Sequence, residues 1–256
     1  MVERLRLSQA NRKRIENIDS CFGTQGETLW TEGRVLVGEG VLMKACRKKP
    51  KPRQFFLFND LLVYGSILIS KKRYHKQRTI PLEQVQLTDI KDDGNIKHAW
   101  QIMTRGKSFT VYAATEMEKQ EWMLHINRCV HEVIKNGKRP ASDHAAVWIP
   151  DSEAAECMCC HASTFTVINR RHHCRSCGNV ICGNCSTHKL LLPVNKHPVR
   201  VCDTCYNKRC NNGDVSIAVP AMSKNDYTHF ETDESEEEEG EDKPADGNQV
   251  DFVVSS

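Results

Sequence analysis

The chain has 256 residues, of which 39% are hydrophobic and 27% are charged, a balance typical of one or two folded domains with appended segments. No run of residues approaches the roughly 20 consecutive apolar positions of a membrane-spanning helix, which argues against an integral membrane protein. The net charge of +3 is unevenly distributed, because residues 231–256 contain eleven acids and one base, and the basic body that remains suits an anionic membrane surface or nucleic acid.

The first predicted element is a short amphipathic helix within residues 1–22, part of an N-terminal helical segment that we place at residues 1–33. Ser8 is expected to cap this helix. Its apolar side consists of Ile15, Ile18 and Phe22.

Short β-rich runs follow, separated by turn sequences such as Asn59-Asp60 and Arg105-Gly106. The predicted strands are residues 35–44, 54–58, 61–64, 67–70, 78–82, 85–89, 98–104 and 108–113. Regular short strands with no helix between them predict a small antiparallel barrel or sandwich.

One strong helix is predicted after the strands. Thr115-Glu-Met-Glu118 forms a capping box, in which Thr115 accepts a hydrogen bond from a free backbone N–H and Glu118 reaches back to the cap. Apolar residues then recur at three- and four-residue spacing until Asn136-Gly137 ends the helix: Trp122, Ile126, Cys129, Val130 and Val133. A barrel of about seven such strands closed by a C-terminal helix resembles a pleckstrin homology (PH) domain, which we place at residues 34–135. The resemblance implies a seven-stranded antiparallel barrel or sandwich.

Residues 136–147 are polar and contain Pro and Gly, and we interpret them as a linker. The next segment, residues 148–210, contains ten of the thirteen cysteines. We expect no cleaved export signal, because the N-terminus lacks an apolar stretch. Thiols that stay in a reducing compartment do not form a disulfide framework, so metal binding is the better interpretation.

Eight of these cysteines form four C-x2-C pairs, separated by 13, 4 and 16 residues. One pair offers two thiolates to a metal ion, and two pairs complete the tetrahedral set of a structural zinc site. We therefore predict two zinc ions with no open coordination position, replacing the core that so short a segment cannot build. Spacing alone leaves both sequential and interleaved pairing of the four pairs open.

A second pattern surrounds the predicted metal ligands. Trp148-Ile-Pro-Asp151 precedes the first pair, Arg170-Arg-His-His-Cys-Arg175 overlaps the second, and Arg200-Val-Cys202 overlaps the fourth. These motifs resemble the FYVE domain, a zinc module of endosomal proteins that recognises phosphatidylinositol 3-phosphate. The resemblance implies a cross-brace, in which one zinc ion is held by Cys157, Cys160, Cys182 and Cys185, and the other by Cys174, Cys177, Cys202 and Cys205.

The basic motif favours an anionic ligand by its own chemistry, because crowded cations repel one another unless an anion lies among them; the alternative is a solvated basic strand. Arginine binds a phosphomonoester through bidentate, charge-assisted hydrogen bonds. The resemblance implies that the arginines bind phosphate, while Asp151 and His173 hydrogen-bond the inositol hydroxyls and Asp151 disfavours a 4- or 5-phosphate. The predicted headgroup-binding residues are Asp151, Arg170, Arg171, His172, His173, Arg175 and Arg200.

Val167 and Ile168 precede this motif. We predict that they form a turret loop that inserts into the bilayer beside the headgroup, with core packing as the alternative.

In the PH segment, a basic loop follows the first strand, at the position where PH domains bind phosphoinositides. The prolines of this loop depart from the usual pattern, and the alternative is a loop that is only solvated. The predicted PH lipid-binding residues are Lys44, Arg47, Lys48, Lys51 and Arg53.

The order of the modules identifies the chain as a member of the phafin family, with an α+β multidomain fold. The resemblance implies a non-enzymatic phosphatidylinositol 3-phosphate effector, in the cytoplasm and peripherally on early endosomes. It also implies roles in endosome fusion and endocytic trafficking, unidentified endosomal tethering partners, and links to autophagy and lysosomes.

The C-terminal extension, residues 211–256, is expected to be disordered from residue 231. We hypothesise that its acidic run lies across the basic PH loop and competes with lipid, an effect that phosphorylation of Ser235 would deepen. The acidic residues proposed for this role are Glu236, Glu237, Glu238 and Glu239. The alternative is a tail that only improves solubility.

Two other functions share parts of this cysteine and charge pattern. Paired-cysteine cross-braces also build RING-type ubiquitin ligases, but those usually include a His ligand and an apolar groove, whereas all eight paired positions here are Cys in cationic surroundings. Basic zinc modules also bind nucleic acid, but the chain lacks an aromatic-basic stacking face and carries Asp151 in the motif. We therefore expect neither an enzyme nor a nucleic-acid partner.

Overall fold

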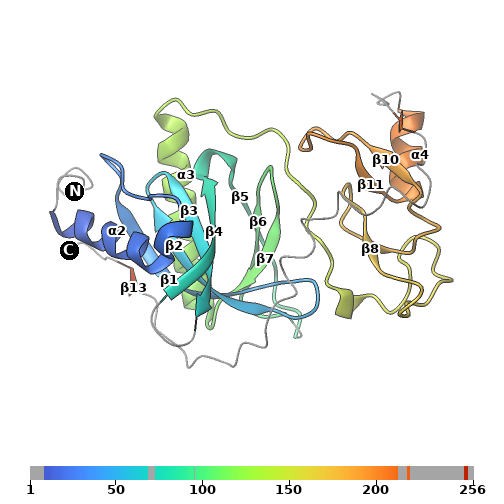
Figure 1. Cartoon of the computed structure of the whole chain (residues 1–256), viewed down its shortest axis with the longest axis horizontal. Helices are drawn as coiled ribbons and strands as arrows, with labels where there is room; N and C mark the ends of the chain where they lie inside the picture. Colours follow the sequence, from blue (N-terminus) through green and yellow to red (C-terminus); the bar gives the residue numbers. More distant parts are fainter. Residues whose placement is uncertain (1–8, 69–72, 95, 213–217, 220–250, 253–256) are drawn as a thin grey trace.

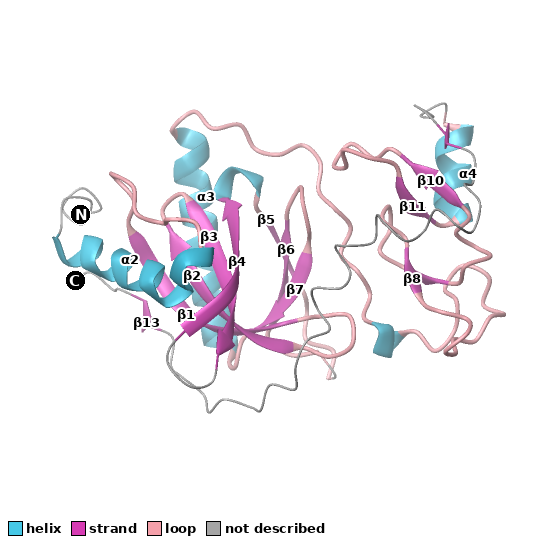
Figure 2. Cartoon of the chain, viewed as in Figure 1, coloured by secondary structure: helices cyan, strands magenta, loops and turns pink. Residues whose placement is uncertain are grey.

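The structure is a computed structural model that describes residues 9–68, 73–94, 96–212, 218–219 and 251–252. A strand-rich module with a long helix forms the first half of the chain, and a smaller module of short strands and one helix follows it (Figures 1 and 2). Within the described ranges, no helix combines the length and apolar character needed to cross a bilayer.

The first module is built on one bent antiparallel sheet in which seven strands follow the order β4-β3-β2-β1-β7-β6-β5. Its strands are β1 (Leu36–Lys44), β2 (Lys51–Phe58), β3 (Leu61–Leu68), β4 (Arg73–Pro81), β5 (Gln86–Asp89), β6 (Ala99–Met103) and β7 (Phe109–Tyr112). A short strand β13 (Asp251–Phe252) also pairs with β1. The predicted seven-stranded antiparallel fold is confirmed.

Strand β3 differs from the sequence prediction, which divided it into residues 61–64 and 67–70. The structure has one continuous strand there, with a register shift against β4 between Tyr64 and Ser66. Gly65 lies at this irregularity, and a Cβ atom on it would be only 2.5 Å from Cε1 of Phe22. The glycine therefore accommodates an approaching aromatic ring and does not end the strand.

Helix α3 (Glu116–Lys135) closes the barrel, as predicted from its apolar stripe. The Thr115 hydroxyl accepts a hydrogen bond from the Glu118 N–H at 3.1 Å, whereas the Glu118 carboxylate accepts one from the Ala114 N–H, one residue before the cap, at 2.8 Å. Trp122 is fully buried and meets the ring of Phe55 edge-on. These contacts make α3 part of the main core.

Helix α2 (Gln9–Phe22) covers a different face of the sheet and creates a second core. The predicted apolar residues of this helix are buried there against Leu29, Phe56 and Phe58. Ser8, the expected cap, lies outside the described residues. The N-terminal segment is thus packed onto the PH module.

The second module is centred on its cysteines. Its elements are η3 (Asp151–Glu153), β8 (His172–His173), β9 (Val180–Ile181), β10 (His188–Leu190), β11 (Val199–Val201), α4 (Asp203–Asn211) and β12 (Ala218–Val219). Its buried cluster contains four apolar side chains, Ile181, Leu190, Leu192 and Val201, beside four cysteines. So small an apolar core needs metal ions to hold the loops.

The segment between the modules lies along the barrel. The Ala141 N–H donates to the Glu83 carbonyl at 3.0 Å, and the Ala145 N–H donates to the Thr104 carbonyl at 2.9 Å. The guanidinium of Arg105 also donates to the Pro193 carbonyl of the second module at 3.4 Å. These contacts bring the second module against the loops at one end of the barrel (Figure 1).

Candidate functional site

The eight paired cysteines gather into two groups of four. Cys157, Cys160, Cys182 and Cys185 form one group, and Cys174, Cys177, Cys202 and Cys205 form the other, with the sulfur atoms of each group within 4.8 Å of one another. Zinc bound by four thiolates at about 2.3 Å has its sulfurs about 3.8 Å apart, so both groups fit the ion. The pairing is interleaved, as the FYVE resemblance implied, and the module is a two-zinc finger.

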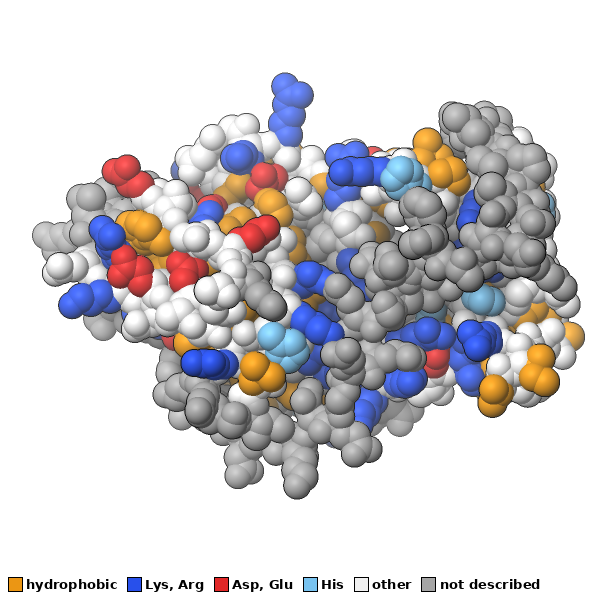
Figure 3. All heavy atoms as spheres, in the orientation of Figure 1, with side chains coloured by type: hydrophobic (Ala, Val, Ile, Leu, Met, Phe, Trp, Pro, Cys, Tyr) orange, Lys and Arg blue, Asp and Glu red, His pale blue; other side chains and the backbone are white. Residues whose placement is uncertain are grey.

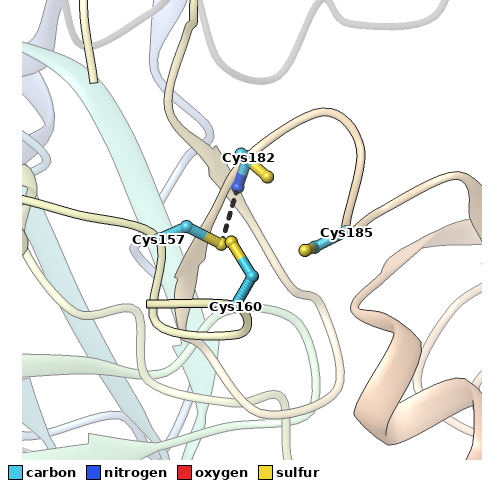
Figure 4. Close-up of side chains that lie close together, drawn as sticks. All are labelled: Cys157, Cys160, Cys182 and Cys185. Atoms are coloured by element: carbon cyan, nitrogen blue, oxygen red, sulfur yellow. Dashed lines mark hydrogen bonds between the residues drawn. The ribbon is translucent and has the colours of Figure 1, made fainter. Parts of the chain in front are cut away.

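Backbone N–H groups point at the sulfur atoms and prepare them for metal. Figure 4 shows the first group, in which the Cys182 N–H donates to the Cys157 sulfur at 3.2 Å. The same contact recurs in the second group, where the Cys202 N–H donates to the Cys174 sulfur at 3.2 Å. Such donors stabilise thiolates, the form that binds zinc.

The pKa values of the thiols reflect this arrangement. The side-chain hydrogen bond from Cys177 and nearby backbone N–H groups lower the pKa of Cys174 to about 4. The shared proton and burial raise the pKa of Cys177. Four neighbouring thiolates therefore repel one another until a dication lies among them, and zinc binding releases the remaining protons.

The backbone at position 178, directly after the second C-x2-C pair, requires a glycine. Its φ is +83°, and a Cβ atom there would lie 1.9 Å from the Val147 carbonyl oxygen. The Ile149 N–H donates to the Gly178 carbonyl at 3.1 Å. This close approach holds the Trp148–Asp151 segment against the zinc frame.

The basic residues beside the second zinc group come from two segments, residues 170–175 and strand β11. Strand β8 supplies His172 and His173, and the Arg175 N–H donates to the Arg200 carbonyl of β11 at 2.9 Å. Arg171 donates to the Ala154 carbonyl at 3.3 Å and lies 4.8 Å from the centre of the Phe165 ring. Arg170 is exposed. The predicted headgroup residues therefore lie on one part of the module.

Trp148, the first residue of the motif that precedes the cysteine pairs, organises this surface through ring contacts that the motif alone does not predict. Its ring stacks on His173, with centroids 4.7 Å apart and planes at 11°, and the Arg175 guanidinium lies 4.2 Å from its centre. Lys107 of the PH module lies 5.5 Å from the same ring. No local pattern identifies Lys107, because the contact joins distant segments.

His173 is almost completely buried, and its Nε2 lies 2.8 Å from the Ile149 carbonyl oxygen. A carbonyl only accepts hydrogen bonds, so Nε2 carries the proton. Burial lowers the pKa of His173, which favours the neutral ring at pH 7. The same Nε2 is 3.8 Å from Oδ1 of Asp151, which brings these two predicted headgroup residues together.

Val167 and Ile168 are 90% and 95% exposed. The core packing weighed as an alternative from the sequence is therefore wrong for these two side chains. Phe165, two residues earlier, instead packs on the cysteine-rich core. Figure 3 shows apolar side chains at the outer end of this module, with Lys and Arg side chains nearby.

The residues predicted to bind lipid in the PH loop differ in their burial and in the groups that they contact. Lys44 is 3% exposed, and its ammonium lies 4.7 Å from the centre of the Phe109 ring, so the structure buries this predicted lipid residue in the barrel instead of presenting it to a membrane. Arg53 donates to the Pro52 carbonyl at 2.8 Å, and Lys51 begins β2. Arg47 lies 3.1 Å from the carboxylate of Asp151 in the second module. A pocket between the modules is lined by residues of both, including Lys44, Arg47, Lys107 and Trp148.

Comparison with known proteins agrees with this architecture. The PH domain family model matches residues 36–131, and the FYVE zinc finger model matches residues 147–211. Pleckstrin homology domain-containing family F member 2 of Homo sapiens is 56% identical over 225 residues, covering 87% of this chain and 90% of the relative. Member 1 of Homo sapiens is 49% identical over 210 residues, covering 81% and 75%.

Among solved structures, the LM5-1 FYVE domain from Leishmania major is 39% identical, covers 29% of this chain and 90% of that chain, and has a TM-score of 0.26. The two modules together define a tandem PH–FYVE protein with two structural zinc sites. Because its identity to the curated relatives extends over most of its length, the chain belongs to the pleckstrin homology domain-containing family F, the phafin family expected from the sequence.

Proposed function

We propose that this protein is a non-enzymatic, peripheral membrane adaptor that binds phosphatidylinositol 3-phosphate on early endosomes. FYVE domains as a class bind membranes that contain this lipid. The observation that carries the proposal is the grouping of Arg171, Arg175 and Arg200 on one zinc-braced part of the module, with Asp151 and the buried His173 beside them. Endosome fusion and endocytic trafficking are the processes in which such an adaptor acts.

In this proposal the arginines bind the 3-phosphate and the phosphate that bridges to the lipid. Arg171, Arg175 and Arg200 each donate to a backbone carbonyl. A phosphate offers them charged acceptors, and hydrogen bonds to charged acceptors are roughly twice as strong as neutral ones. The carboxylate of Asp151 faces the inositol hydroxyls and repels a second phosphate beside them.

Membrane insertion supplies the rest of the affinity. Val167 and Ile168 project from the same module that carries the headgroup residues. Each contributes up to about 1.5–3 kcal/mol when it leaves water for the acyl region. Neighbouring basic residues add about 1 kcal/mol each near anionic lipid.

The PH loop is proposed as a second, weaker phosphoinositide contact through Lys48, Lys51 and Arg53. Two weak contacts in one chain act by avidity, since the first binding event raises the effective concentration of the second site. Binding through both modules also orients the protein on the membrane.

Vesicle flotation of the zinc-loaded full chain tests the proposal. Vesicles containing phosphatidylinositol 3-phosphate should bind the wild type, whereas vesicles with phosphatidylinositol, the 4-phosphate or the 4,5-bisphosphate should bind much less. Arg171→Ala should abolish the preference, and Arg53→Ala should weaken total binding only. Arg128→Ala, an exposed arginine on α3, is the matched control. Equal binding of Arg171→Ala and wild type would refute the assignment.

The acidic tail is proposed as a competitor of the PH loop. Ser235 and Glu236–Glu239 lie outside the described residues, so the support is their charge alone. Deleting residues 231–256 should strengthen binding to anionic vesicles, most clearly at low salt. Unchanged binding would leave the tail as a solubilising segment.

The same preparations separate the alternatives. A RING-type ligase would discharge ubiquitin from a charged conjugating enzyme, and we expect no discharge. A nucleic-acid module would bind duplex or single-stranded oligonucleotides with an affinity that falls steeply with salt. We expect this protein to form no such complex. Links to tethering proteins, autophagy and lysosomes are proposed on the family resemblance and require pull-downs from endosomal membranes.

A further inference from the structure

One arginine of the PH module bridges two parts of the FYVE module. The Nε of Arg47 donates to Oδ2 of Asp151 at 3.1 Å, and its Nη2 donates to the Arg171 carbonyl at 3.3 Å. In the reverse direction, the Asp151 N–H donates to the Arg47 carbonyl at 2.8 Å. These three contacts connect the PH loop to both the Trp148–Asp151 segment and the basic motif.

The two oxygens of the Asp151 carboxylate differ, because one accepts a hydrogen bond from Arg47 and the other has no partner among the described residues. The Asp151 side chain is only 18% exposed, and Oδ2 accepts the Arg47 hydrogen bond. Oδ1 is buried and has no hydrogen-bond partner among the described residues. Its neighbour His173 lies 3.8 Å away and donates its Nε2 proton to Ile149 instead. A buried acceptor of this kind lacks one donor, such as a ligand hydroxyl.

We propose that Arg47 is a positioning residue of the FYVE headgroup site, so that the PH and FYVE modules build one lipid site together. The proposal rests on the function proposed above. Arg47 fixes Oδ2, and this leaves Oδ1 of Asp151 as the acceptor for an inositol hydroxyl. The second hydrogen bond of Arg47, to the Arg171 carbonyl, holds the guanidinium in place beside this carboxylate.

The chemistry of this bridge requires arginine. The planar guanidinium presents several N–H donors in a fixed fork, so one side chain reaches a carboxylate and a carbonyl at the same time. A lysine keeps the charge but offers a single ammonium on a flexible stem. The contact therefore transmits orientation as well as charge.

The bridge also reassigns Arg47. The sequence placed it with the PH lipid residues, where it would bind a phosphate directly. A guanidinium that donates to Asp151 and to the Arg171 carbonyl is engaged with the FYVE module instead. The two roles predict opposite results in a double-variant experiment, because a positioning residue acts only through Asp151.

The test uses the zinc-loaded full chain and vesicles containing phosphatidylinositol 3-phosphate. Arg47→Ala should weaken binding by about 3- to 10-fold, the range for losing one partly exposed charged hydrogen bond. Arg47→Lys should not restore it. Lys49→Ala is the matched control, because it removes the same charge from an exposed position of the same loop and should bind like wild type.

A double-variant cycle distinguishes positioning from direct lipid contact. If Arg47 acts through Asp151, then Arg47→Ala combined with Asp151→Asn binds no more weakly than Asp151→Asn alone. Both single variants should also narrow the preference for the 3-phosphate over the 3,5-bisphosphate. A full additional loss in the double variant would overturn the proposal, as would equal binding of Arg47→Ala and Lys49→Ala.

Two controls separate the possible failures. Two zinc ions per chain and an unchanged melting temperature show that a variant is folded; should Arg47→Ala lose zinc, Arg47→Lys carries the test and must bind more weakly than wild type. If wild type ignores the 3-phosphate, the proposed function itself fails. If wild type binds and Arg171→Ala does not, yet Arg47→Ala matches Lys49→Ala, only the role of Arg47 fails.

Discussion

The turret loop offers the most direct quantitative test of membrane binding. Val167 and Ile168 are 90% and 95% exposed, so almost their whole side chains are available to enter a bilayer. Replacing both by alanine removes five carbon atoms, which correspond to at most about 4 kcal/mol of transfer free energy at about 0.8 kcal/mol per methylene. Insertion to half that extent gives about 2 kcal/mol.

These free energies convert to a loss of vesicle affinity between about 30-fold and about 700-fold. Folding stability should change by less than about 0.5 kcal/mol, because neither side chain is part of the core. Vesicle sedimentation at fixed lipid composition measures the affinity, and titration with the soluble inositol 1,3-bisphosphate headgroup measures the headgroup site alone. The headgroup affinity should be unchanged.

Leu124→Ala provides the matched control, since Leu124 is 65% exposed on α3 and lies in the PH module. It should bind vesicles like the wild type. If the turret variant keeps wild-type vesicle affinity, the two residues do not enter the membrane. If it loses headgroup affinity as well, they support the binding surface and their exposure has another meaning.

Three further predictions concern stability and metal. Chelating zinc should unfold the FYVE module and expose its thiols to a thiol reagent, because each structural zinc site contributes about 10–16 kcal/mol. The PH core around Trp122 should keep its near-ultraviolet circular dichroism. Thiols that stay protected after complete zinc removal would contradict this. Gly178→Ala should destabilise that module by more than about 3 kcal/mol and release zinc, because the φ of Gly178 is +83° and the new Cβ would meet the Val147 carbonyl. Gly183→Ala is the control, since the atom nearest to its new Cβ is 4.0 Å away, and metal analysis should find both zinc ions retained. Burial raises the pKa of Cys129 from 9.0 to about 11. The protonated thiol therefore contributes about 2–3 kcal/mol to the free energy of unfolding below pH 9, and this contribution is lost as the pH rises to 11. Denaturant unfolding of Cys129→Ala should accordingly show a smaller alkaline loss than wild type; parallel losses would count against this reasoning.

Local patterns in the sequence were sufficient to predict many of the secondary-structure elements and the metal ligands of this protein. The eight zinc ligands, the α3 stripe and the basic motif all depend on spacing over a few residues, and metal coordination and helix geometry impose such spacing directly. The limits of the strands depend on more than local patterns. Residues 61–68 form one strand, and Gly65 within it leaves room for the ring of Phe22, which comes from a helix more than forty residues earlier.

Other features were decided by the tertiary structure alone. Spacing left two ways to pair the four cysteine pairs, and only the folded module shows the interleaved one. Arg47 and Asp151 are 104 residues apart, and each belongs to a motif that is complete without the other. Side chains so distant meet only when two finished modules pack together, and a contact of that kind leaves no periodicity or spacing in the chain.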